Sequence, residues 1–163
     1  TSFEKFSESD WDKVMDVNVK APFFLTQKLF GKLKAAGCEG APARVINISS
    51  IAGMSDYGSA QDANIYSYTT SKAGLIQLSK ALAMRFSREG ITVNTISPGM
   101  FPSKINTDYI ETHGSEVVQN IPLGRVGAME DIVGAIMYLS SSAGAWITGT
   151  NLVVDGRKRV MRS

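Results

Sequence analysis

Tyr68 and Lys72 are the side chains whose types and spacing point most directly to chemistry. They lie four residues apart in a segment that is predicted to be helical, so both project from the same face of that helix. An ammonium group beside a phenol favours the phenolate and lowers the phenol pKa from about 10 towards the range of a general acid or base. Such pairs also occur on solvated helix faces, so the spacing alone leaves a purely structural role open.

Further polar residues are expected at the same place in the fold. Ser50 follows a short apolar segment, 45–49, that is predicted to be a buried strand, and a Ser-Pro-Gly sequence ends a second one, 91–96. Asn18 lies inside an otherwise apolar predicted helix, where its low helix propensity suggests a particular task for its amide. Because ligand sites of parallel sheets lie outside the carboxyl ends of the strands, these groups are expected to converge there.

The elements that must position these residues follow from apolar periodicity and from helix breakers. Helices are predicted over 9–36, 66–88 and around 132–139, the first with a kink or restart at Pro22 and an end at Gly37. Strands are predicted over 45–49, 91–96 and 152–154. The segment 100–122 has no strong period apart from a short helix near 115–119, and we expect a mobile excursion that can cover a site. The alternation of helices and strands predicts an α/β fold with a parallel sheet.

Composition and charge limit the class of protein. The 163 residues, 44% of them hydrophobic and 20% charged, fit one globular domain, and no run of about 18 apolar residues suggests a membrane span. The net charge is +2, but four of the 17 basic residues stand in the segment 157–163. The rest of the chain has 13 basic residues against 15 acidic ones, a net charge of −2. We therefore expect neither a nucleic-acid nor a membrane partner. The basic tail is expected to be solvated, and a weak contact with an anionic partner is the alternative.

Two lone residues carry little functional weight. Cys38 is the single cysteine and cannot form an internal disulfide, so the expected location is cytoplasmic and the thiol is expected to be inert. His113 has no second ligand at metal-binding spacing, and no metal site is expected.

The motifs, taken in order, resemble the C-terminal portion of the short-chain dehydrogenase/reductase (SDR) family over nearly the whole chain. Tyr68 and Lys72 match its Tyr-x-x-x-Lys signature, whereas Tyr66 has Thr70 four residues on and does not. The other matches follow in the family's order: Trp11 with 17–19, 46–50 with Gly53, Val93 with Asn94, Pro98 with Gly99, 147–149, and Asp155 with Gly156. The stretch 98–104 further resembles 3-oxoacyl-acyl-carrier-protein reductases of the rhamnolipid type.

This resemblance implies a fold and a set of catalytic residues. The fold would be α/β, the C-terminal part of a Rossmann-like doubly wound parallel sheet, with 1–163 forming one partial domain. Tyr68 would give a proton to a substrate carbonyl oxygen while a nicotinamide gives hydride to its carbon. Ser50 would hydrogen-bond the same oxygen. Lys72 would hold Tyr68 at a useful pKa and bond the nicotinamide ribose, and Asn18 would order a water that relays protons to Lys72.

The resemblance also implies a cofactor site, a lid and an assembly. The turn at Pro98 and Gly99, with the backbone of Phe101 and the hydroxyl of Ser103, would hold the nicotinamide carboxamide. Residues 101–121 would form a lid over a small carbonyl or alcohol substrate. A homodimer or homotetramer would form through the helices 9–36 and 66–88.

One departure from the family pattern is large, because the first dinucleotide-binding half is absent. No glycine-rich turn that could bind the pyrophosphate stands before Asn18, so the sequence does not show whether NADP or NAD is used; NADP is expected from the subfamily resemblance. A second departure is Arg157, where the family often repeats glycine. Two functions stay open: the catalytic half of an NAD(P)-dependent carbonyl reductase that needs an upstream segment, or a truncated, non-catalytic homologue acting as an oligomerisation partner.

Overall fold

Three parallel strands form the centre of the fold. A computed structural model describes residues 3–54, 65–104 and 106–156, so the basic tail with Arg157 and most of the loop after Ser50 lie outside the described residues. The strands are β1 (Ala43–Ile48), β2 (Ile91–Pro98) and β3 (Asn151–Val154), in the order β1-β2-β3 with both pairs parallel. The predicted α/β fold with a parallel sheet is confirmed, with β2 running two residues further than expected.

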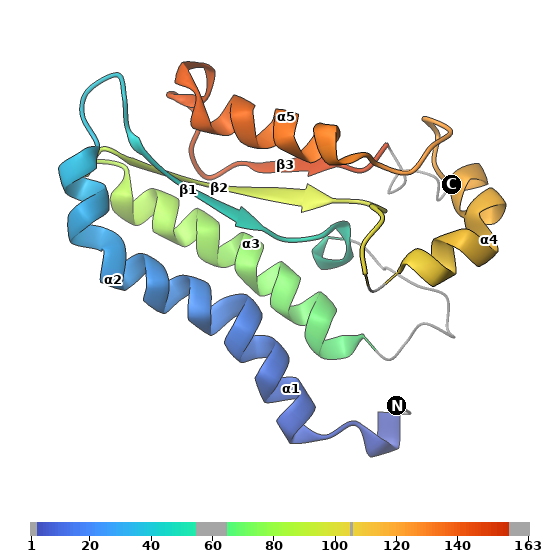
Figure 1. The fold of residues 1–163 in the computed structure, drawn as a ribbon. Helices are drawn as coiled ribbons and strands as arrows, with labels where there is room; N and C mark the ends of the chain where they lie inside the picture. Colours follow the sequence, from blue (N-terminus) through green and yellow to red (C-terminus); the bar gives the residue numbers. More distant parts are fainter. Residues whose placement is uncertain (1–2, 55–64, 105, 157–163) are drawn as a thin grey trace.

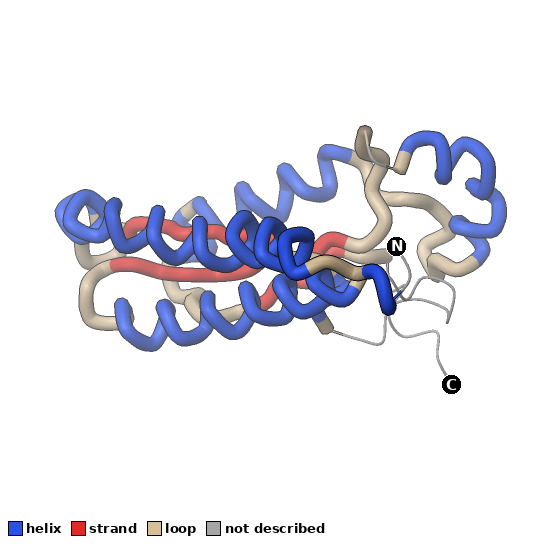
Figure 2. Tube along the Cα trace, turned by 90° about the horizontal axis from the view of Figure 1, so that it is seen from below, coloured by secondary structure: helices blue, strands red, loops and turns tan. Residues whose placement is uncertain are grey.

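Helices cover both faces of this sheet (Figure 1). The helices are α1 (Glu8–Met15), α2 (Ala21–Ala36), α3 (Tyr66–Phe86), α4 (Thr107–Gln119) and α5 (Met129–Ser140). On one face lie α2 and α3, with α1 continuing from α2, and α5 lies on the other; Figure 2 shows the first group in front of the strands. The helix α4 lies beyond the carboxyl ends of the strands.

The core is divided into two apolar layers by β2. Its residues from Ile91 to Ser97 are buried, because helices cover both of its faces and a strand lies on each side. Val93 packs with Leu82 and Phe86 of α3, whereas Ile96 packs with Leu139 of α5. The alternation of side chains along a strand directs these neighbours to opposite faces. The sheet is thereby held in place between α3 and α5.

The predicted helix 9–36 is one continuous rod with a defect before Pro22. Ser7 caps α1 by accepting a hydrogen bond from the Asp10 N–H at 3.1 Å. A π-helical turn, Asp16–Lys20, joins α1 to α2. Pro22 has no N–H to donate to the carbonyl four residues earlier, and the wider turn accommodates this loss. Asn18 lies inside this turn, and Gly37 ends α2 as predicted.

The expectation of a largely irregular segment between 100 and 122 is wrong. The helix α4 spans Thr107–Gln119 and is kinked at His113, which has φ −118° and ψ 17°. Only Val117 of this helix is buried, and Gly114 follows the kink. The sequence predicted only its last turns, because His113 and Gly114 interrupt the apolar pattern between residues 109–110 and 117–118.

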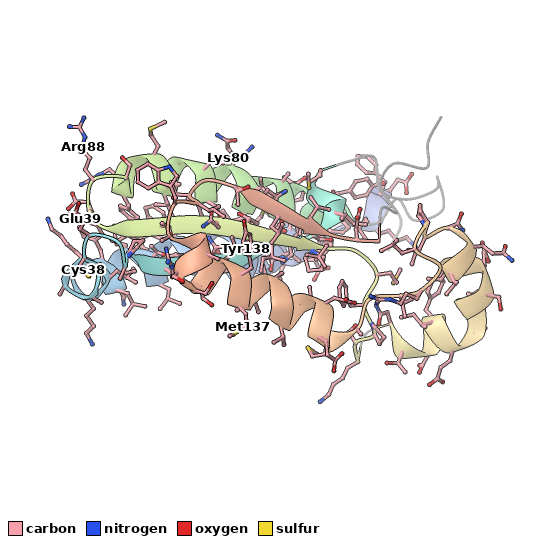
Figure 3. The ribbon with its side chains drawn as sticks, turned by 90° about the horizontal axis from the view of Figure 1, so that it is seen from above. Cys38, Glu39, Lys80, Arg88, Met137 and Tyr138 are labelled. Carbon is pink, nitrogen blue, oxygen red and sulfur yellow. The ribbon has the colours of Figure 1, made fainter. Side chains whose placement is uncertain are left out.

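The opposite end of the molecule, at the amino ends of the strands, is a turn that contains Cys38 and Glu39 (Figure 3). A Cβ at Gly37 would overlap the carbonyl oxygen of Gly90, so this close approach requires glycine. Within the described ranges, none of the helices combines the length and apolar character needed to span a membrane.

Candidate active site

The predicted catalytic residues gather where β1 ends and α3 begins. Tyr68 and Lys72 lie in the first turns of α3, and Ser50 lies two residues beyond the end of β1. Asn18 reaches α3 from the π-helical turn, which packs against that helix. Three elements of the chain, β1, α3 and the π-helical turn, therefore contribute to one region at the carboxyl end of the sheet.

Lys72 connects α3 to the end of β1. Its Nζ donates a hydrogen bond to the Ile48 carbonyl at 3.0 Å and lies 5.7 Å from the centroid of the Tyr68 ring. The Ser49 hydroxyl donates to the Lys72 carbonyl at 2.8 Å, so strand and helix are joined twice. Burial lowers the pKa of the Lys72 ammonium below its usual value, because the charged form loses hydration. The structure thus places the ammonium beside the phenol ring, as the spacing of four residues predicts.

Ser50 begins the 3₁₀ turn η3 (Ile51–Gly53), which lies directly on α3. Its Oγ accepts a hydrogen bond from the Ala52 N–H at 3.1 Å, so the hydroxyl proton points elsewhere and can be donated. A Cβ at Gly53 would lie 2.5 Å from the Ala73 nitrogen and 2.6 Å from the Lys72 carbonyl carbon. Glycine at this position therefore lets the turn that carries Ser50 approach the helix that carries Lys72.

Asn18 contacts α3 through a buried serine that the sequence analysis did not identify. The Asn18 Nδ2 donates to the Ser71 Oγ at 3.0 Å, and this hydroxyl donates to the Tyr68 carbonyl at 2.8 Å. Ser71 is completely buried. Ser71 stands between Tyr68 and Lys72 in the sequence. Its position on the inner face of α3 is the one sequence feature that could have indicated its role. The amide of Asn18 thereby fixes the helical turn that presents both residues, while the proton relay through water stays a prediction.

The predicted carboxamide site begins where β2 meets β3. The Gly99 N–H donates to the Val154 carbonyl at 2.8 Å, and a Cβ at Gly99 would lie 2.7 Å from the Asp155 Cα. Glycine is therefore needed for this tight passage out of the sheet. Phe101 packs its ring against Gly127, where a Cβ would overlap it. The loop that carries Phe101 and Ser103 is thus held close to the ends of β2 and β3.

The residues present fit the nicotinamide-ribose end of a dinucleotide. An ammonium has three N–H donors. Among the residues that the structure describes, Ile48 accepts from one of the donors of Lys72, so two are available for ribose hydroxyls. The Tyr68 hydroxyl has no hydrogen-bond partner among these described residues, and Tyr68 is 38% exposed. Neutral hydroxyls and one ammonium at a strand edge suit a carbonyl substrate better than a metal ion. The described residues contain no group of three or more His, Cys, Asp or Glu side chains that could hold a metal.

Comparisons with known proteins agree with this arrangement. Residues 1–156 match the family model described as enoyl-(acyl carrier protein) reductase. The chain is 39% identical over 152 residues to the 3-oxoacyl-[acyl-carrier-protein] reductase FabG of Rickettsia conorii, covering 93% of this chain and 59% of that protein. It is also 39% identical over 158 residues to the rhamnolipids biosynthesis 3-oxoacyl-[acyl-carrier-protein] reductase of Pseudomonas aeruginosa, covering 95% and 60%.

A solved structure shows the same likeness in three dimensions. The Pseudomonas aeruginosa RhlG/NADP active-site complex superposes with a TM-score of 0.88 at 37% identity, over 98% of this chain and 62% of that one. The chain thus spans about three fifths of the length of the relatives it matches. Motif order, parallel topology and the match over residues 1–156 agree, and the chain belongs to the short-chain dehydrogenase/reductase family.

Proposed function

We propose that this chain is the catalytic half of an NAD(P)-dependent oxidoreductase that reduces a carbonyl compound, of the 3-oxoacyl type, to an alcohol. The observation that carries the proposal is the position of Lys72, whose Nζ bridges to the end of β1 while lying 5.7 Å from the Tyr68 ring. Residues outside this sequence would complete the dinucleotide site, in keeping with the three-fifths coverage of the relatives. The FabG and rhamnolipid relatives support the 3-oxoacyl class, and the RhlG complex supports NADP.

In the proposed reaction, each of the four residues has a separate task. The bound nicotinamide supplies the hydride. The Tyr68 hydroxyl donates its proton to the carbonyl oxygen, and the Ser50 hydroxyl donates a hydrogen bond to the same oxygen. The Lys72 ammonium stabilises the phenolate that Tyr68 becomes after it donates its proton. The same ammonium binds the ribose. Asn18 holds the Tyr68 turn through Ser71 and orders the water that returns a proton towards Lys72.

The substitution Tyr68→Phe tests the proposal in the natural full-length protein. It removes the proton donor and keeps the ring, so we expect turnover of a 3-oxoacyl thioester such as acetoacetyl-coenzyme A to fall by about 10²–10⁴-fold. NADPH affinity should stay nearly unchanged. The matched control is Tyr66→Phe, because the Tyr66 ring lies edge-on to Phe3 and Phe6 at 5.6 and 5.9 Å and phenylalanine keeps that packing. Unaltered turnover in Tyr68→Phe would exclude Tyr68 as the acid.

The non-catalytic alternative makes a different prediction for nucleotide binding. A truncated oligomerisation partner would bind neither NADPH nor NADH, with or without an upstream segment. The proposed enzyme would bind nucleotide once that segment is present. Fluorescence titration of the chain alone and of the chain mixed with an upstream fragment separates the two functions.

We also propose that α4 and its flanks, residues 101–121, form the substrate lid. The place of α4 beyond the carboxyl ends of the strands supports this role (Figure 1). Tyr109, half exposed on α4 and stacked on His113 at 4.7 Å, offers an aromatic surface for an apolar substrate. We further propose that the protein is cytoplasmic, as expected from its single cysteine.

Self-association through the predicted helices 9–36 and 66–88 is the proposed assembly, as a homodimer or homotetramer. Large apolar side chains project from both segments: Val17, Leu25 and Met84 are 69%, 61% and 79% exposed. Leu25→Glu should reduce the mass measured by light scattering. Met137→Glu is the matched control, because Met137 is also 61% exposed but lies on α5, on the other face of the sheet (Figure 3). Equal masses for both variants would reject this interface.

A further inference from the structure

The loop between β2 and α4 is folded around the side chain of one residue, Asn106. This residue immediately precedes α4, at the position where an asparagine commonly caps a helix by accepting a hydrogen bond from the second or third helical N–H. The Asn106 side chain makes no such bond. It turns back into the loop instead, and its Oδ1 accepts from the Ser103 N–H at 2.7 Å and from the Ser103 Oγ at 2.9 Å.

The other end of the same amide holds the next part of the loop. The Asn106 Nδ2 donates to the Phe101 carbonyl at 2.8 Å and lies 3.6 Å from the Met100 sulfur. The Ser103 carbonyl in turn accepts from the Asn106 N–H at 3.1 Å and from the Thr107 N–H at 3.0 Å. The described residues of this segment, 100–104 with Asn106 and Thr107, thus close on themselves, and the Asn106 side-chain amide is hydrogen-bonded through both its oxygen and its nitrogen.

These bonds determine which polar groups the loop can present to a ligand. A serine hydroxyl has one proton and two lone pairs, and the proton of Ser103 is used by Asn106, so its oxygen is left as an acceptor. The Phe101 carbonyl is engaged, whereas its N–H donates no hydrogen bond within the described residues. One acceptor and one donor held a short distance apart complement the NH₂ and the C=O of a primary carboxamide.

We infer that Asn106 is a positioning residue that orders the loop of Phe101 and Ser103 to receive the carboxamide of the nicotinamide. The inference rests on the proposed function. Ordering these groups before binding reduces the entropy lost when a ligand immobilises an exposed loop. Asn106 does not touch the carboxamide; it acts through Ser103 and Phe101.

The experiment compares two nucleotides in the full-length protein carrying Asn106→Ala. NADPH contains the nicotinamide, whereas 2′-phospho-ADP-ribose lacks it, and NADH with ADP-ribose serve if the protein prefers NAD. We expect calorimetry to show dinucleotide binding weakened about tenfold, equivalent to 1.4 kcal/mol, with the truncated nucleotide within about twofold. Asn106→Asp keeps acceptors for Ser103 and loses the donor to Phe101, so its loss should be intermediate.

The control is Ser140→Ala at the end of α5, outside the proposed lid. Ser140 is exposed, and its Oγ also donates to a backbone carbonyl, that of Ile136, at 2.7 Å. It should change the affinity for neither nucleotide. Hydrogen exchange without nucleotide provides a second readout: the Ser103 amide should lose protection in Asn106→Ala, while the β2 amides keep theirs and show that the protein is folded.

The outcomes separate this inference from the proposed function. Equal weakening of both nucleotides, or of neither, in a protein with intact β2 protection overturns the role of Asn106 and leaves the proposed function standing. An unchanged exchange rate at Ser103 also overturns it. If the unsubstituted protein binds no dinucleotide, the proposed function fails and the inference fails with it.

Discussion

Replacing Gly53 with alanine tests whether the close approach of η3 to α3 sets the catalytic geometry. The added Cβ would lie 2.5 Å from the Ala73 nitrogen, whereas ordinary contact begins at 3.4 Å, so the two backbones must separate by the difference, about 0.9 Å. Ser50 and Gly53 belong to the same short turn, and Ile51 and Ala52 between them are each only 3% exposed. A shift of Gly53 away from α3 therefore moves Ser50 with it.

This displacement should lower both the free energy of unfolding and the turnover. Overpacking of a well-packed interior typically costs about 1–3 kcal/mol, and we expect the free energy of unfolding to fall by that amount. A misplacement of about 1 Å can reduce turnover by about 10²-fold. Because Ser50 would move relative to Tyr68 and Lys72, we expect a loss of that size in carbonyl reduction by Gly53→Ala.

Urea denaturation and the rate of NADPH oxidation with acetoacetyl-coenzyme A measure both effects. The matched control is Gly134→Ala, because Gly134 lies inside α5 and a Cβ there would meet nothing within 4 Å. Alanine is the better helix former, so this variant should gain about 0.5–1 kcal/mol and keep its turnover. If Gly53→Ala behaves like Gly134→Ala in both assays, the steric argument is refuted.

Three further substitutions are predicted to change stability. Asn18→Ala removes the bond to the buried Ser71 and should lower the free energy of unfolding by about 1 kcal/mol in urea. Arg44→Met removes the donors to the carbonyls at and just after the C-terminus of α5, the shortest at 2.9 Å, and should lower it by about 1–2 kcal/mol in the same assay. Asp131 has its pKa lowered from 3.8 to about 2, chiefly by hydrogen bonds from Arg125. Its stabilising effect is complete above pH 3.8 and is lost as the pH falls through about 2. The difference in urea midpoint between Asp131→Asn and the unsubstituted protein should therefore shrink over that window.

Each of these predictions has a result that contradicts it. Unchanged stability in Asn18→Ala would show that Ser71 holds the Tyr68 turn without help. A urea midpoint of Arg44→Met equal to that of the unsubstituted protein would mean that water replaces the guanidinium as hydrogen-bond donor at the end of α5. A difference for Asp131→Asn that stays constant down to pH 2 would show that the carboxylate is not stabilised by folding.

Local sequence patterns were sufficient for the strands and for most helices. The apolar steps of Leu75, Leu78, Leu82 and Phe86 place one side of α3 against the sheet, and the structure has that helix over 66–86. The pattern failed for α4, because its apolar residues form two short pairs, 109–110 and 117–118, and the kink at His113 followed by Gly114 separates them. It also could not distinguish a kink at Pro22 from the π-helical turn just before it.

Residue periods and spacings within single elements were enough to predict the α/β class, the three strand segments and the pairing of Tyr68 with Lys72. The order of the strands in the sheet came from the three-dimensional structure. Tertiary structure alone decided the contacts between elements. Asn18 meets Ser71 across 53 residues, Lys72 meets the carbonyl of Ile48, and Asn106 turns away from its helix into the loop. Such contacts depend on how closely two backbones approach, and that distance is set by packing against residues far away in the chain.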